Sequence, residues 1–172
     1  MKKPGAWPGS ILLKLKVFDH ASSIPDKEYN LSLRRSEGPM KVDGKCLCDF
    51  LTYEAEVDPE AVLICNCTDC QTLSGSAFRV TVEATGFRFL SGSPSTFVKV
   101  ADSGARRVLA FCPRCGTSVL SRPVDGEEGY FGLRVGSLNQ RAQLVPRAQY
   151  WCSSAQTWTD RMADLPKHNG NV

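Results

Sequence analysis

Apolar and polar residues alternate along much of the chain after Lys41, which is the pattern of half-buried β-strands. Over residues 51–57, Leu, Tyr, Ala and Val alternate with Thr and Glu. Over residues 78–83, Phe and Val alternate with Arg, Thr and Glu until Gly86 interrupts the run, and residues 87–90 follow as a partner strand. Gly, Asp and Ser bound three further expected strands, at 96–100, 107–111 and 130–135.

Helical patterns are few, and we expect only a short turn of helix around Asp69–Leu73. The pattern therefore predicts a mainly β fold of short antiparallel strands. Residues 1–39 differ from the rest, because they hold several prolines and no cysteine, and we expect a poorly ordered N-terminal extension. The predicted domain covers residues 40–165, and a flexible tail covers 166–172.

Charge and hydropathy narrow the classes of function. The formal net charge of +3 comes entirely from the first 40 residues, because residues 41–172 carry fourteen basic and fourteen acidic side chains. A domain without a basic face is not expected to bind nucleic acid. No apolar run approaches the roughly 20 residues of a membrane span. No secretory cleavage site follows Ile11–Phe18, so we expect a cytoplasmic protein, with the nucleus as an alternative.

Cysteines carry the candidate chemistry. Seven of the eight fall into three tight clusters: Cys46 and Cys48; Cys65, Cys67 and Cys70; and Cys112 and Cys115. In a reducing compartment such clusters indicate metal ligands, whereas a secreted disulfide framework is the alternative. Seven thiols suffice for one closed four-thiolate zinc site and one three-thiolate site with a free position.

The sequence Cys112-Pro-Arg-Cys115-Gly116 is the most specific of the three motifs. Both sulfurs of such a knuckle can reach one metal, and Gly116 can adopt the positive φ that turns the chain back beneath them. Cys46 and Cys48 must bend out of a regular strand to share a metal, because residues i and i+2 lie roughly 6.5–7 Å apart there. The knuckle can supply their missing ligands, but spacing alone leaves the pairing open.

The triplet Cys65, Cys67 and Cys70 can cap one face of a metal and leave a fourth position free. With three thiolates Zn²⁺ keeps enough positive character to bind a water or a sulfur. The alternative is that Cys152 or solvent closes the site, which would then be structural. Nearby, Ser74–Ser76 are candidates for binding a substrate carboxylate, or form a plain loop, and Asp69 is a candidate base or a support for the ligands.

Three stretches together resemble the glutathione-dependent formaldehyde-activating enzyme family, also called the centromere protein V/Gfa domain. They are Gly44–Cys48, Cys65–Phe78 with its Cys-x-Cys-x-x-Cys and Ser-Gly-Ser, and Phe111–Thr117. A late segment with Gln149, Tyr150, Trp151 and Trp158 resembles the end of that family. The resemblance covers about residues 40–165. Family members often have His where this chain has Asn66.

The resemblance implies an Mss4-like zinc-binding β fold with two zinc ions. It assigns Cys46, Cys48, Cys112 and Cys115 to a structural zinc, and Cys65, Cys67 and Cys70 to a second, catalytic-type zinc. It also implies carbon–sulfur lyase activity on small thiol adducts, with glutathione as the thiol and formaldehyde as the carbonyl partner. The competing hypothesis is a non-enzymatic zinc-stabilised scaffold that binds a macromolecular partner.

Overall fold

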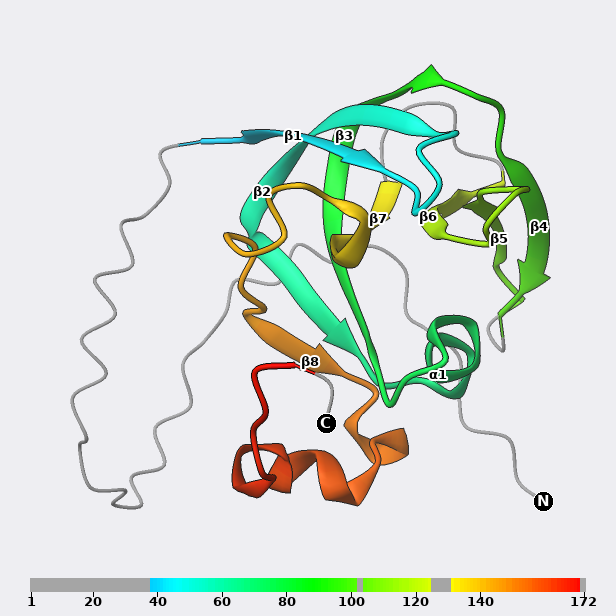
Figure 1. Ribbon diagram of the computed structural model, residues 1–172. Coiled ribbons are helices and arrows are strands. Elements are labelled where there is room, and N and C mark those ends of the chain that lie inside the picture. The colour runs from blue at the N-terminus through cyan, green and yellow to red at the C-terminus, as the bar shows by residue number, and fades with distance from the viewer. Residues whose placement is uncertain (1–37, 102–103, 125–130, 171–172) are drawn as a thin grey trace.

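The computed structural model describes residues 38–101, 104–124 and 131–170 of the 172-residue chain (Figure 1). The predicted N-terminal extension therefore lies almost wholly outside the described residues, as do the first residue of the expected strand at 130–135 and the last two residues of the predicted tail. The strands are β1 (Met40–Lys45), β2 (Thr52–Cys65), β3 (Arg79–Ser91), β4 (Ser95–Val100), β5 (Arg106–Phe111), β6 (Ser118–Pro123), β7 (Phe131–Arg134) and β8 (Ala148–Tyr150). The helices are α1 (Thr68–Ser74) and the 3-10 helices η1 (Val135–Ser137), η2 (Cys152–Ser154) and η3 (Thr157–Asp164).

The strands form one curved sheet in the order β1-β2-β3-β7-β6-β5-β4, and every neighbouring pair in this order is antiparallel. The short strand β8 joins the sheet by pairing in parallel with the end of β2. In Figure 1, β4 and β5 lie on the opposite side of the molecule from β1 and β2, with α1 near the lower ends of β2 and β3. The predicted mainly β, antiparallel fold with few short helices is confirmed.

Two strands are longer than predicted: β2 continues from the predicted segment 51–57 to Cys65, and β3 joins two predicted strands. The sequence predicts two strands separated by Gly86, but the structure has one continuous strand from Arg79 to Ser91. Gly86 has a φ of 59°, so it bends the strand in a conformation that other residues rarely adopt. Both halves of β3 pair with β2 instead of with each other. A glycine in a strand pattern therefore marks a bend here and not a turn.

The hydrophobic core lies on the face of β3 that carries Val82 and Ala84 and extends to Leu133 on β7 and Tyr53 on β2. The Tyr53 ring is fully buried, and its hydroxyl donates to the Ser137 carbonyl at 3.0 Å. At Gly44 a Cβ atom would lie 2.5 Å from this ring, so glycine is required for close packing against Tyr53. Gly44 lies within β1, and the turn toward β2 is made further on, where Asp49 has a φ of 60°.

The opposite face of β3 is unusual. Alternation predicts that Arg79, Thr81 and Glu83 lie on the polar side of a half-buried strand, and only Glu83 is exposed. Arg79 and Thr81 are buried, at 6% and 8% exposure. This part of the sheet is thus covered on both faces, and one of its buried faces is polar.

The predicted domain limits of 40 and 165 stay a prediction, although the first strand begins at Met40 and the last helix ends at Asp164. Within the described ranges, no helix has the length and apolar composition that a membrane crossing requires.

Candidate metal centres

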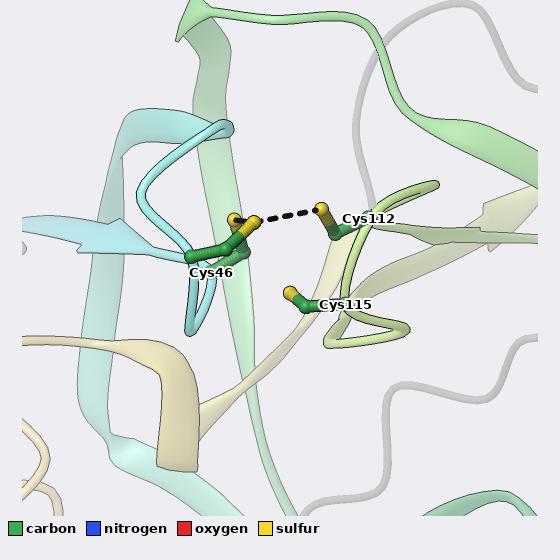
Figure 2. A group of neighbouring side chains, drawn as sticks. Cys46, Cys112 and Cys115 are labelled. Carbon is green, nitrogen blue, oxygen red and sulfur yellow. Dashed lines mark hydrogen bonds between the residues drawn. The ribbon is translucent and has the colours of Figure 1, made fainter.

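Two loops bring the first group of four cysteines together. Cys46 and Cys48 lie in the turn between β1 and β2, and Cys112 and Cys115 lie in the turn between β5 and β6. The four sulfurs lie within 4.8 Å of one another, and Figure 2 shows Cys46, Cys112 and Cys115 pointing toward one another from the two loops. The structure therefore groups Cys46 and Cys48 with Cys112 and Cys115 and not with the triplet.

The sulfur separations in this group fit a tetrahedral metal site. Cys46 Sγ and Cys48 Sγ are 3.6 Å apart, and Cys48 Sγ and Cys112 Sγ are 3.7 Å apart. Four sulfurs at 2.3 Å from a tetrahedral Zn²⁺ are about 3.8 Å from each other, whereas a disulfide needs about 2.05 Å. The donor set and its spacing are thus compatible with zinc.

Backbone geometry holds these thiols in place. Gly116 has the predicted positive φ, 72°, and its N–H donates to the Cys112 carbonyl at 2.9 Å. The Leu51 N–H donates to Cys46 Sγ at 3.2 Å. Cys46 and Cys112 are almost fully buried, at 1% and 0% exposure. Buried sulfurs with directed N–H donors are typical of a closed structural site.

The pKa values of the four thiols differ widely. The Thr117 hydroxyl, 3.2 Å from Cys115 Sγ, lowers the pKa of Cys115 to about 5. Although the Phe50 N–H favours the Cys48 thiolate, desolvation and the neighbouring thiols raise the pKa of Cys48 to about 12. Thiols this close cannot all ionise without a compensating cation.

The second group contains three sulfurs. Cys65 is the last residue of β2, Cys67 precedes α1, and Cys70 lies in the first turn of α1. Their sulfurs lie within 4.8 Å of one another, with Cys65 Sγ and Cys67 Sγ 3.5 Å apart. Each is partly exposed, in contrast to Cys46 and Cys112. This spacing also fits a tetrahedral metal, with one ligand position not filled by a cysteine of the described chain.

Cys152 does not close this second group. Its side chain is exposed and contacts the Gln149 carbonyl at 3.8 Å, and it is not among the three grouped sulfurs. Among the described residues, no His, Asp or Glu joins the three cysteines either. Asp69, the candidate base, instead forms an ion pair with Lys99 on β4.

Hydrogen bonds and burial shift the pKa values of the three thiols in different directions. A hydrogen bond with Cys65 raises the pKa of Cys70, and the same bond lowers the pKa of Cys65. Burial raises the pKa of Cys67. The charge of nearby Arg79 acts on Cys70 in the direction that favours its thiolate.

Two side chains to which the sequence analysis gave no structural role, Asn66 and Gln71, position the triplet. Asn66 is 1% exposed, and its Nδ2 donates to the Tyr150 carbonyl at 3.1 Å. Gln71 Nε2 donates to the carbonyls of Asn66 and Ser154 at 2.7 and 2.8 Å. These bonds fasten α1 to the C-terminal segment after β8. The signal for Asn66 and Gln71 was present in the sequence only as their place inside and just after the cysteine triplet.

Ser74–Ser76 have a local structural role. The Ser74 hydroxyl donates to the Cys70 and Phe78 carbonyls at 2.7 and 3.1 Å. Gly75 has a φ of 61°, and its N–H and that of Ser76 both donate to the Gln71 carbonyl. These donors end the helix, so they are not available to a substrate carboxylate in this conformation.

Fold and site together define a β protein with two groups of thiols that can each hold a metal ion. The sequence profile of the family "glutathione-dependent formaldehyde-activating enzyme" matches residues 41–154. The chain belongs to this family, which the resemblance predicted.

A crystal structure of a Rhodobacter sphaeroides protein, determined in a structural genomics programme, is similar to this one with a TM-score of 0.49. It shares 17% sequence identity, and the alignment covers 62% of this chain and 98% of that chain. No curated protein matches the sequence significantly.

Proposed function

We propose that the chain is a zinc-dependent enzyme of the carbon–sulfur lyase type that acts on small thiol adducts such as S-hydroxymethylglutathione. The observation that carries the proposal is the difference between the two thiol groups. One has four sulfurs, enough to fill a tetrahedral site, and two of its cysteines are buried; the other has three sulfurs, one short of that number, and all three of its cysteines are partly exposed. Family membership favours glutathione as the thiol.

In this proposal one thiol group stabilises the fold and the other binds the substrate. Cys46, Cys48, Cys112 and Cys115 hold a structural zinc, while Cys65, Cys67 and Cys70 hold a second. A Zn²⁺ ion held by three thiolates would supply a positive centre that lowers the pKa of a thiol in its fourth position.

The reaction joins the substrate thiol to a carbonyl carbon. The thiolate sulfur forms a bond to the carbon of formaldehyde, the C=O π pair moves to the oxygen, and the oxygen takes up the proton that the thiol released. The reverse reaction breaks the same C–S bond. Asn66 and Gln71 serve this chemistry by fixing the loop and helix that carry the three cysteines, and their hydrogen bonds exclude alternative positions of α1.

The test is exchange between ¹³C-formaldehyde and its glutathione adduct, followed by NMR. The wild-type protein should accelerate exchange above the uncatalysed rate, and Cys67→Ser should abolish the acceleration. Cys152→Ser is the matched control, because it removes an exposed thiol outside both groups, and it should leave the rate unchanged. No acceleration by wild-type protein carrying both metals would favour the scaffold hypothesis instead. We propose the cytoplasm as the location, with the nucleus as the alternative.

A further inference from the structure

Arg79 is a buried charge with an unused hydrogen-bond donor. The residue is 6% exposed, and its Nη2 is buried with no hydrogen-bond partner among the described residues. An arginine stays protonated at any physiological pH, and burying an ion costs several kcal/mol unless it is compensated. The ion pairs found among the described residues do not include Arg79, whereas Arg88 on the same strand pairs with Glu54. A compensating anion is therefore expected at Arg79.

The position of Arg79 is next to the three-thiol group. Arg79 is directly opposite Cys65 in the antiparallel pairing of β2 with β3. Residues directly opposite each other in such a pair project from the same face, with Cβ atoms about 4.5–5.5 Å apart. The guanidinium is also close enough for its charge to act on Cys70.

The polar face continues away from the cysteines. Thr81 follows two residues after Arg79, and Arg134 on β7 is directly opposite Thr81. Arg134 is 9% exposed, and its Nη1 donates to the Thr81 hydroxyl at 3.4 Å. Two buried guanidinium groups thus share one face of the sheet beside the cysteines. Such a face favours a negatively charged ligand over a neutral one.

Several other donors near the triplet are occupied. The Ser74 hydroxyl and the N–H groups of Gly75 and Ser76 are bonded to backbone carbonyls, as described above. Lys99 pairs with Asp69. Arg79 Nη2, in contrast, is a buried donor without a partner among the described residues. A guanidinium fork matches the two oxygens of a carboxylate.

We propose that Arg79 forms an anion subsite beside the three-thiol group, and that it binds the carboxylate of a small thiol acid whose sulfur lies at those cysteines. This inference rests on the proposed function, since it names the class of thiol that the site selects. In this inference a residue of β3, and not the Ser74–Ser76 loop, selects ligands that carry a carboxylate. The competing explanation is that Arg79 only balances the charge of the thiolates, in which case the carboxylate of a ligand would not matter.

The test uses three matched ligands. N-acetylcysteine carries a thiol and a carboxylate, its amide carries the thiol alone, and N-acetylalanine carries the carboxylate alone. Calorimetry on the full chain, with zinc content measured, should show the acid binding about tenfold or more tightly than the amide. Arg79→Gln should reduce this ratio to near one by weakening only the acid, and Arg79→Lys should keep part of it. Arg88→Gln, a change at an exposed arginine on the same strand, should leave the ratio unaltered.

Several results would overturn the subsite. They are a ratio near one in the wild type, a ratio that Arg79→Gln does not change, or equal weakening of acid and amide in that variant. If Arg79→Gln does not fold, the wild-type ratio and Arg79→Lys decide.

The third ligand separates this inference from the proposed function. If neither thiol binds but N-acetylalanine binds in an Arg79-dependent manner by ligand-observed NMR, the subsite stands and the thiol function fails. If the amide binds as well as the acid, the thiol site stands and the subsite fails. If no ligand binds, both fail.

Discussion

Replacing Cys112 by serine should destabilise the whole domain. Cys112 is fully buried, and its sulfur is 3.7 Å from that of Cys48, a residue 64 positions away. In our account a metal at this site joins the β1–β2 turn to the β5–β6 turn. Losing one ligand therefore weakens a link between sequence-distant strands.

The magnitude follows from the energetics of structural zinc. Apparent binding free energies are about 10–16 kcal/mol in small zinc domains, and this energy is part of the folding free energy. Removing one of four ligands should forfeit about 3–5 kcal/mol of it, a large part of a total stability of about 5–15 kcal/mol. At about 3–4 °C per kcal/mol, the melting temperature should fall by about 10–20 °C.

Differential scanning calorimetry with parallel zinc analysis is the assay. Cys67→Ser should lower the melting temperature by less than about 5 °C, because its site spans only residues 65–70. Cys152→Ser, at an exposed thiol, should change it by about 2 °C or less. The reasoning is refuted if Cys112→Ser melts within about 2 °C of wild type, or if Cys67→Ser is equally damaging.

Three further predictions concern the supports and limits of the sites. Gln71→Ala should weaken zinc binding at the three-thiol site about 10–100-fold in chelator competition without affecting the four-thiol site, because α1 loses its bonds to the C-terminal segment; equal loss at both sites would contradict this role. Deleting residues 1–38 should leave a folded domain with both metals, since the segment holds no cysteine, and aggregation or zinc loss would show that our domain limit is wrong. Zinc binding at pH 7 should release at least three protons, measured by calorimetry in buffers of different ionisation enthalpy. The pKa values of Cys48, Cys67 and Cys70 are raised, so these thiols hold protons that the metal must displace, and affinity should rise with pH. Release near zero would contradict the thiolate sites.

Much of the fold followed from local patterns. The Gly, Asp and Ser residues that bound them located β4, β5 and β7 to within two residues at each end, and the short helix after Cys67 was expected where α1 is found. Strands β1, β6 and β8 were not predicted. The exposed strand β8 has three residues, too short for alternation to show, and it forms only by pairing with the end of β2.

The two cysteine groups could be predicted from the sequence, but the residues around them could not. Cysteines spaced one or two residues apart indicate metal ligands, because few structures other than metal sites need cysteines so close together. Arg79 gave no such signal, since an arginine alternating with valines usually faces water. Its burial depends on what covers the second face of the sheet, which is a tertiary feature. The same holds for Gln71, whose partner Ser154 lies 83 residues away.

Native mass spectrometry with and without reduced glutathione tests the central claim most directly. The wild-type chain should carry two zinc ions and, with the thiol present, gain the mass of one glutathione. Cys67→Ser should carry one zinc and gain none. A single zinc in the wild type, or a glutathione adduct that persists in Cys67→Ser, would contradict the assignment of an open three-thiolate zinc as the thiol site.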